Sequence, residues 1–313
     1  MFAPQSKMLT GKMRDASMKL GLGTVQFGLD YGVSNKKGKT PPEEAYDILE
    51  AAHRLGIRVL DTAALYGSSE ETLGHCLLPH HNFSIITKTP QFSSPTLAPF
   101  DAKLLVDTFH QSLTRMRQKS IYGLLIHQAD DLLKDNGHLL AETMVRLKQS
   151  GFVEKIGVSV YTGAQIDRIL ELYPVDIIQL PLNILDQRLL LSGHLSKLKK
   201  SGIEIHARSV FLQGLLLMNP AHLPEYFSPV KKHLEHFQLS MRRIGISPKQ
   251  AALQFVMGIK EIDTVLCGVN NRAQLLELSN LARLPSEPLV PERFSISDDT
   301  ILNPSKWRID THS

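Results

Sequence analysis

The chain has 313 residues, enough for one large domain or for two average ones. Hydrophobic residues make up 42% of it and charged residues 21%, values typical of a folded globular protein, which excludes disorder of the whole chain. The formal net charge is +4, and the 35 lysines and arginines are spread along the sequence instead of forming a basic stripe. Electrostatics therefore give no reason to expect a nucleic-acid partner.

The N-terminal segment and the two cysteines indicate where the protein resides. No apolar stretch reaches the roughly 18 residues that a membrane-spanning helix needs, so we expect no membrane partner. Residues 1–18 lack the continuous apolar segment of a secretory signal, and we expect a loose leader followed by one domain over residues 19–313. Cys76 and Cys267 lie in apolar surroundings, which indicates buried free thiols and a cytoplasmic location.

Short apolar runs alternate with segments in which apolar residues recur at spacings of three and four. The runs predict β-strands at 19–23, 57–61, 83–88, 123–127, 155–160, 175–180, 203–208 and 264–269. The segments between them predict α-helices at 42–55, 69–78, 101–116, 137–149, 163–173, 191–201, 247–259 and 271–282. Two of these helices start with a capping signal, Ser68–Ser69 and Ser247–Pro248.

This alternation predicts an α/β fold, a single-domain (β/α)8 TIM barrel, with an open doubly wound sheet as the alternative. The glycine pattern of residues 21–28, GLGTVQFG, departs from that of a dinucleotide-binding turn and opens no helix, which disfavours the alternative. Two proline-containing stretches interrupt the alternation, residues 212–246 and the tail from about residue 284. We expect long loops or extra helices after the seventh strand and at the C-terminus, where they could cover a ligand or meet a partner.

Three successive predicted strands end on polar residues of catalytic types. The second, third and fourth runs close on Asp61, Lys88 and His127, and Tyr66 follows shortly after Asp61. Because the active sites of such barrels lie at the carboxyl ends of the strands, we expect these four side chains to meet at one mouth. A strand-end lysine also suits a Schiff-base aldolase, although that chemistry gives Asp61 and Tyr66 no role.

Several motifs resemble those of the aldo-keto reductase family, between about Leu20 and Leu278. They are GLGT at 21–24, DTAALYGSSEETLG at 61–74, TK at 87–88, His127, GVS at 157–159, QLPLN at 179–183 and GVNNRAQL at 268–275. The resemblance implies the barrel fold and an oxidoreductase that reduces aldehydes or ketones with a nicotinamide cofactor, usually NADP(H) and otherwise NAD(H). The partner is then a small-molecule carbonyl substrate, and the protein is a monomer or a small homo-oligomer.

By this resemblance Asp61, Tyr66, Lys88 and His127 form the catalytic set, and their chemistry suits carbonyl reduction. Hydride transfer builds negative charge on the carbonyl oxygen, which requires a proton donor and fixed hydrogen bonds. Tyr66 is the predicted general acid, and we expect the Lys88 ammonium to lower its pKa from about 10 toward the working pH. Asp61 would keep Lys88 charged and in place, while His127 would orient the carbonyl.

The resemblance also implies a set of cofactor-binding residues. Ser159 and Gln179 would hold the nicotinamide carboxamide, although Val160 replaces the asparagine that commonly follows the serine. Arg208 stands where many members have a stacking tyrosine; it could stack on the nicotinamide, reach a phosphate or form a salt bridge at the barrel rim. The remaining predicted cofactor residues are Gly23, Thr24 and Asp61 at the first two strands, Gln213 and Gly214 near the pyrophosphate, and Gly268, Asn270, Arg272 and Gln274 at the adenosine end, where Arg272 alone would meet a 2′-phosphate.

The residues that select the substrate are less well defined by the sequence. Candidates for the pocket lining are Phe27, Tyr31, Leu65, Tyr161, Phe211 and Trp307. The stretch GTVQFGLDYG at 23–32 is similar to reductases of carbohydrate metabolism, which implies sugar-like carbonyl substrates. An alternative function within the family is a cofactor-binding regulatory subunit that senses redox state with little turnover. The histidines at 75, 80 and 81 lack a suitable spacing for metal binding, and we expect no metal site.

Overall fold

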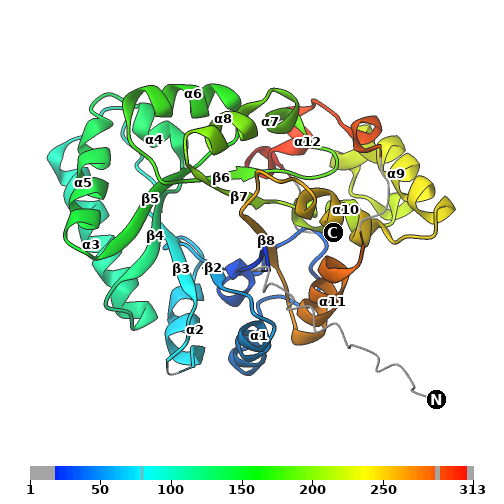
Figure 1. The fold of residues 1–313 in the computed structure, drawn as a ribbon, viewed down its shortest axis with the longest axis horizontal. Helices are drawn as coiled ribbons and strands as arrows, with labels where there is room; N and C mark the ends of the chain where they lie inside the picture. Colours follow the sequence, from blue (N-terminus) through cyan, green and yellow to red (C-terminus); the bar gives the residue numbers. More distant parts are fainter. Residues whose placement is uncertain (1–17, 79, 286–289, 309–313) are drawn as a thin grey trace, which may run out of the picture.

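The computed structural model describes residues 18–78, 80–285 and 290–308, so nearly all of the predicted leader lies outside the described residues. Parallel strands form a closed barrel in which β8 returns to pair with β1 (Figure 1). The predicted (β/α)8 barrel is therefore confirmed. Its strands are β1 Leu20–Gly23, β2 Val59–Asp61, β3 Ser84–Lys88, β4 Ile121–Ile126, β5 Val153–Ser159, β6 Ile177–Pro181, β7 Glu204–Arg208 and β8 Thr264–Gly268.

Helices surround the barrel and cover the outer faces of its strands (Figure 1). The helix predicted at 191–201 has wrong boundaries, because the chain forms two shorter helices there with Gly193 between them at a φ of 78°, which glycine adopts without strain. The α-helices are α1 Pro42–Arg54, α2 Ser69–Cys76, α3 Pro99–Met116, α4 Ala129–Leu133, α5 His138–Gln149, α6 Gly163–Leu172, α7 Arg188–Leu191, α8 His194–Lys200, α9 Lys231–Arg243, α10 Pro248–Met257, α11 Arg272–Arg283 and α12 Asp299–Leu302.

The two predicted capping signals have different outcomes. Ser247 is the N-cap of α10, and its Oγ accepts a hydrogen bond from the Gln250 backbone N–H at 3.1 Å, so this prediction is confirmed. At α2 the prediction is wrong, because the side chain of Ser68 makes no capping hydrogen bond. The hydroxyl of Ser69 instead donates to the Thr24 carbonyl at 2.8 Å and thereby ties the start of α2 to the end of β1.

Strand register decides which residues meet at the carboxyl end of the barrel. Gly23 is aligned with Asp61 on one side and with Gly268 on the other. Ser159 is aligned with Gln179 in the same way. Because parallel strands end at a common edge, polar residues from distant parts of the sequence gather there.

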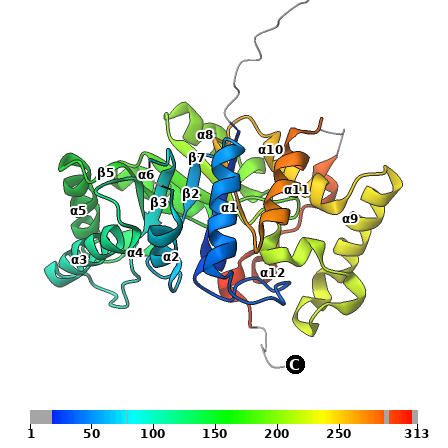
Figure 2. The same ribbon diagram turned by 90° about the horizontal axis from the view of Figure 1, so that it is seen from below.

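The stretch after β7 and the tail form a second hydrophobic core beside the barrel. Figure 2 shows α9 at one side of the molecule, next to α10. Phe227 and Phe237 are fully buried in this core, and Phe294 and Ile301 join them from the tail. The prediction of long loops or extra helices is confirmed; the short 3-10 helices here are η2 Leu212–Leu217, η3 Pro220–His222, η4 Glu225–Val230, η5 Pro291–Phe294 and η6 Pro304–Lys306.

A partly buried polar cluster lies at the amino-terminal end of the barrel. Glu204, the first residue of β7, accepts hydrogen bonds from the Tyr122 hydroxyl at 2.7 Å and from His206 Nε2 at 2.6 Å, and it pairs with the Lys155 ammonium. Burial opposes ionisation of Glu204, but hydrogen bonds from His206, Lys155 and Tyr122 outweigh it and hold its pKa at about 2. The ionised carboxylate therefore joins β4, β5 and β7.

Glu204 should make the stability of the protein depend on pH. Its pKa rises from about 2 to the ordinary 4.5 on unfolding, so the stabilisation is complete above pH 4.5 and is lost as the pH falls toward 2. The shift corresponds to at most roughly 3 kcal/mol, because solvent screens this partly exposed carboxylate. In urea unfolding at pH 7, Glu204→Gln should have a lower free energy of unfolding than wild type. The difference between the two free energies should become smaller as the pH falls below 4.5. Glu142→Gln on the exposed face of α5 is the control; a difference that is independent of pH would contradict the prediction.

Candidate active site

A cavity of about 860 Å³ opens at the carboxyl ends of the strands. Asp61, Tyr66, Lys88 and His127 all line it, as do residues from the ends of β1, β5, β6, β7 and β8. The structure thus brings together the four side chains that the sequence predicted to meet at one mouth.

Lys88 and Asp61 form a buried ion pair in the floor of this cavity. The ammonium Nζ lies 2.8 Å and 2.7 Å from the two Asp61 carboxylate oxygens and 2.8 Å from the Thr62 carbonyl oxygen. Lys88 is only 1% exposed. Burial lowers the pKa of the ammonium, and the Asp61 carboxylate opposes that change. An ammonium has three donors, so these partners satisfy all of them.

The environment of Tyr66 differs from the prediction in one respect. Burial raises the pKa of its phenol above the ordinary value, and the Asp61 carboxylate adds to this effect. The predicted lowering by Lys88 is wrong for this arrangement, because the ammonium donates to Asp61 and Thr62 and lies 5.0 Å from the Tyr66 ring centroid. The nearby charge that does favour the phenolate is Arg208, without outweighing burial. Tyr66 therefore keeps its proton.

His127 follows β4 directly and stands beside Tyr66. Its backbone N–H donates to Thr89 Oγ1 at 3.1 Å, and its ring packs edge-on against the Tyr66 ring with centroids 5.8 Å apart. Burial lowers the pKa of His127, the charges of Lys88 and Arg208 lower it further, and the result is about 3. The imidazole is therefore neutral at pH 7 and can donate one hydrogen bond to a carbonyl oxygen.

The loop that carries Tyr66 is fixed by contacts with the end of β1. Thr24 Oγ1 donates to the Asp61 carbonyl at 3.0 Å and lies 2.9 Å from Ser69 Oγ. Gly28 allows the two loops to touch, since a Cβ there would lie 1.7 Å from the Tyr66 carbonyl oxygen. Thr24 lines the cavity, but its hydroxyl is engaged in this network. Its hydroxyl consequently positions the Tyr66 loop.

Gln179 connects the ion pair to the region predicted to hold an amide ligand. Its Nε2 donates to Asp61 Oδ1 at 2.7 Å, so Lys88 and Gln179 hold the same carboxylate. Within the described ranges, Ser159 Oγ and Gln179 Oε1 make no hydrogen bond, and both residues line the cavity. Val160 is fully buried and does not line it. An amide ligand would thus have one hydroxyl and one amide oxygen available.

Arg208, at the end of β7, lies in the cavity wall. Its guanidinium carbon is 4.2 Å from the Tyr161 ring centroid, and its Nη2 donates to the Val160 carbonyl at 3.1 Å. The predicted rim salt bridge is wrong for the part of the chain that the structure describes, because its donors there face a carbonyl and the Ser209 hydroxyl. One face of the guanidinium lies on the Tyr161 ring, which leaves the opposite face for stacking on a ligand and its other N–H groups for an anionic group.

The segment after β7 lies against the segment after β1 along one side of the cavity. Gln213 and Gly214 both line the cavity and have positive φ values of 53° and 93°. A Cβ on Gly214 would lie 1.8 Å from Ser34 Oγ, so the close approach of the two segments requires glycine.

Among the predicted cofactor residues at the end of β8 and the start of α11, three line the cavity and one does not. Gly268, Asn270 and Gln274 line it. The exposed side chain of Arg272 does not, and the Arg272 backbone N–H donates to Glu44 Oε1 at 2.6 Å. The Arg272 side chain therefore lies outside the cavity in this structure, and its contact with a 2′-phosphate stays a prediction.

Sequence reasoning placed Glu277 at this part of the cavity but missed Lys249, the cation with which it pairs. Lys249 on α10 and Glu277 on α11 both line it, with the ammonium 2.6 Å from the carboxylate. Lys249 follows the capping signal of α10, and Glu277 lies in the predicted helix 271–282, but no local pattern indicates that the two helices present them to one cavity.

The candidates for substrate contact also divide into two groups. Tyr31, Tyr161 and Phe211 line the cavity. The prediction is wrong for the other three, none of which lines it: Phe27 is fully buried in the main core, Leu65 is exposed, and Trp307 packs on the second core.

Two observations test whether the cavity suits a nicotinamide dinucleotide. Gln26 Oε1 is buried without a hydrogen-bond partner within the described ranges. It stands beside Gly268, where a Cβ would lie 2.5 Å from that oxygen. A cavity this large, with a glycine-lined surface and amide and hydroxyl groups free for a polar ligand, fits the cofactor.

Comparisons with known proteins show the family of the chain. The model of the aldo/keto reductase family matches residues 19–299. L-galactose dehydrogenase of Arabidopsis thaliana is 27% identical over 294 residues, which cover 86% of this chain and 87% of the relative. Aldo-keto reductase YhdN of Bacillus subtilis is 25% identical over 289 residues, which cover 84% of each chain.

Solved structures share the fold at lower identity. An aldo-keto reductase from Bacillus halodurans, in its holo form, has a TM-score of 0.70 at 22% identity and covers 88% of this chain and 89% of its own. Glycerol dehydrogenase from Gluconobacter oxydans has a TM-score of 0.68 at 21% identity, with 94% of each chain covered. The fold and the site define a barrel oxidoreductase. The chain belongs to the aldo/keto reductase family, as the match over residues 19–299 shows.

None of the helices within the described ranges has the length and apolar character needed to cross a membrane.

His127 should remain neutral well below the ordinary pKa of histidine. Because its pKa falls from 6.5 to about 3 on folding, the unfolded chain takes up a proton that the folded protein excludes. The free energy of unfolding should therefore fall as the pH drops from 6.5 toward 3, and His127→Gln should weaken this dependence. NMR of the imidazole resonances, assigned with this variant, should show no titration of His127 between pH 8 and 5. His138→Gln, at the exposed start of α5, is the matched control; a His127 signal that titrates in this range would contradict the assignment.

Proposed function

We propose that the protein reduces aldehydes or ketones to alcohols with a reduced nicotinamide cofactor. The observation that carries this proposal is the meeting of a protonated Tyr66, a neutral His127 and the Lys88–Asp61 pair at one wall of the cavity. Two neighbouring proton donors that line one cavity suit a reaction in which negative charge develops on a carbonyl oxygen.

Each residue would have a distinct part in the reaction. The cofactor, when bound, supplies the hydride. His127 donates a hydrogen bond that orients the carbonyl oxygen, and Tyr66 gives its phenolic proton to that oxygen. Lys88, whose donors are directed to Asp61 and Thr62, acts as a fixed positive charge that stabilises the developing anion.

The residues that hold the cofactor follow from the groups left free around the cavity. Ser159 and Gln179 would bind the carboxamide of the nicotinamide, and Arg208 would stack on its ring or meet a phosphate. Further cavity residues proposed for cofactor binding are Gly23, Thr24, Gln213, Gly214, Gly268, Asn270 and Gln274. Two buried free thiols are consistent with a cytoplasmic location, which we include in the proposal.

A sugar-like carbonyl compound is the substrate class that we propose. The relative from Arabidopsis thaliana, a dehydrogenase of L-galactose by its name, supports this class. The cavity supports it too, because Asp130, Tyr161 and Ser305 offer it polar side chains.

Tyr66→Phe should separate chemistry from binding. Removal of the hydroxyl eliminates the proton donor, so kcat for reduction of an aldehyde such as D-glyceraldehyde should fall about a thousandfold. Fluorescence titration should show that the affinity for NADPH is kept. Tyr46→Phe on the exposed face of α1 is the matched control and should behave as wild type; near-normal turnover of Tyr66→Phe would disprove the assignment.

The Lys249–Glu277 pair should set the choice between NADPH and NADH. We expect wild type to bind the two within about tenfold of each other, because Glu277 neutralises the Lys249 ammonium, which lines the cavity together with Asn270 and Gln274 of the predicted adenosine end. Glu277→Gln should raise the affinity for NADPH several-fold and leave that for NADH unchanged, whereas Lys249→Gln should lower the affinity for NADPH. Arg272→Gln is the control. Loss of NADPH affinity in Arg272→Gln alone would overturn this prediction.

A further inference from the structure

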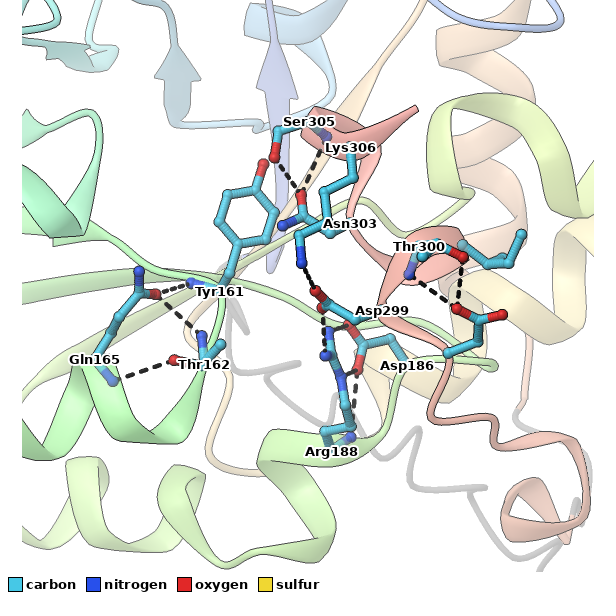
Figure 3. Close-up of polar contacts among 12 residues, drawn as sticks. Tyr161, Thr162, Gln165, Asp186, Arg188, Asp299, Thr300, Asn303, Ser305 and Lys306 are labelled. Atoms are coloured by element: carbon cyan, nitrogen blue, oxygen red, sulfur yellow. Dashed lines mark hydrogen bonds and ion pairs between the residues drawn. The ribbon is translucent and has the colours of Figure 1, made fainter. Parts of the chain in front are cut away.

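The C-terminal segment supplies one wall of the cavity, although it lies beyond the last barrel strand. Asn303 and Ser305, which we call the polar wall, line the cavity together with Tyr161 from the loop after β5. Figure 3 shows the Tyr161 ring facing this part of the segment. A wall made from the end of the chain needs an attachment to the barrel if its position is to be fixed.

Ion pairs provide that attachment (Figure 3). Arg188, at the start of α7, binds both carboxylate oxygens of Asp186 through Nε and Nη2, each at 2.8 Å. Its Nη1 donates to Asp299 Oδ1 of α12, also at 2.8 Å. We call these three residues the tether. Lys306 pairs with the other oxygen of Asp299 and, with Arg188, lowers the pKa of that carboxyl.

The tether is rigid by its geometry. Asp186 is 2% exposed, and a bidentate contact fixes the plane of the guanidinium. With the guanidinium plane fixed, Nη1 of Arg188 can point in only one direction, toward Asp299 Oδ1. The carboxylate at the start of α12 is thereby held four residues before Asn303.

The polar wall offers hydrogen bonds to a ligand. Asn303 Oδ1 accepts from the Ser305 backbone N–H at 3.1 Å and from Ser305 Oγ at 2.7 Å, which fixes the orientation of the Asn303 amide. Among the described residues, Asn303 Nδ2 and the Tyr161 hydroxyl make no hydrogen bond, and both residues line the cavity. Donors and acceptors on two sides of a cavity suit a ligand with several hydroxyl groups.

We propose that Arg188 is a positioning residue that holds the polar wall against the cavity, and that the polar wall binds hydroxyl groups of a polyhydroxylated carbonyl substrate. The second part rests on the proposed function, whereas the first does not. Hydrophobic contacts hold the segment independently, since Ile301 and Leu302 are buried in the second core and Trp307 packs on Phe227 with ring centroids 4.8 Å apart. Loss of the tether should therefore shift the wall without unfolding the protein.

Asp299→Ala is the best variant for the test. It removes the acceptor that Arg188 reaches on the segment and leaves the buried Asp186 paired with Arg188, whereas Arg188→Met would leave that carboxylate buried and unpaired. Glu171→Ala, which removes an exposed ion pair with Arg168 on α6, is the matched control.

Trp307 reports on the tether without any need for turnover. It is the only tryptophan of the chain and lies directly after η6. Acrylamide quenching of its fluorescence should increase about twofold in Asp299→Ala and should not change in Glu171→Ala. Quenching equal to that of wild type in Asp299→Ala would overturn the positioning role.

Two aldehydes of equal chain length test the binding role. Asp299→Ala and Asn303→Ala should each raise KM about tenfold more for D-glyceraldehyde than for propanal, which has no hydroxyl groups. Equal losses for both aldehydes, or none for D-glyceraldehyde, would overturn the binding of hydroxyl groups.

The failure of the proposed function has a different signature. If wild type reduces neither aldehyde, the reductase proposal fails. The quenching comparison still shows whether the tether holds the C-terminal segment in place. Calorimetric measurement of galactitol binding then tests whether the polar wall binds hydroxyl groups. Asn303→Ala should lower the affinity for galactitol about tenfold. Galactitol binding that is unchanged in Asn303→Ala, or absent from wild type, would overturn the binding role.

Discussion

Lys88 places an ammonium group at the carboxyl end of the barrel with 1% of the residue exposed. A charge at that depth needs a partner of opposite sign and further hydrogen bonds, because its removal from water is costly. Asp61 supplies the partner and the Thr62 carbonyl the further acceptor, while Gln179 donates to the same carboxylate from the far side of the barrel. Loss of either charge would leave the other buried and unpaired, at a cost of roughly 3–5 kcal/mol. The pair therefore fixes the ends of β2, β3 and β6 relative to one another.

The remaining electrostatics of the site follow from this pair and from Arg208. Since the donors of Lys88 are directed to Asp61 and Thr62, its charge acts on neighbouring groups only through space. That charge helps to keep His127 neutral. Burial keeps the proton on Tyr66. The cavity thus holds two neutral proton donors beside fixed positive charge, the arrangement that a developing alkoxide requires.

The architecture outside the barrel serves the same site. The stretch after β7 and the C-terminal tail cannot bury their apolar residues against the barrel alone, and they pack on each other, as Phe237 and Phe294 do with ring centroids 5.3 Å apart. Fully burying a side chain of this size contributes roughly 1.5–3 kcal/mol. This second core carries the tail to the cavity, where the tether and the polar wall complete it.

The amino-acid sequence by itself determined the barrel, the family and the approach of Asp61, Lys88 and His127, because the residue that closes an apolar strand is a local feature and parallel strands end at one edge. Only the tertiary structure decided the direction of the Tyr66 pKa, which depends on burial and on which partners take the donors of Lys88. It also decided that Lys249 reaches the cavity and Arg272 does not. The reason is physical: these properties depend on distances between segments far apart in the chain, and no pattern within one segment encodes them.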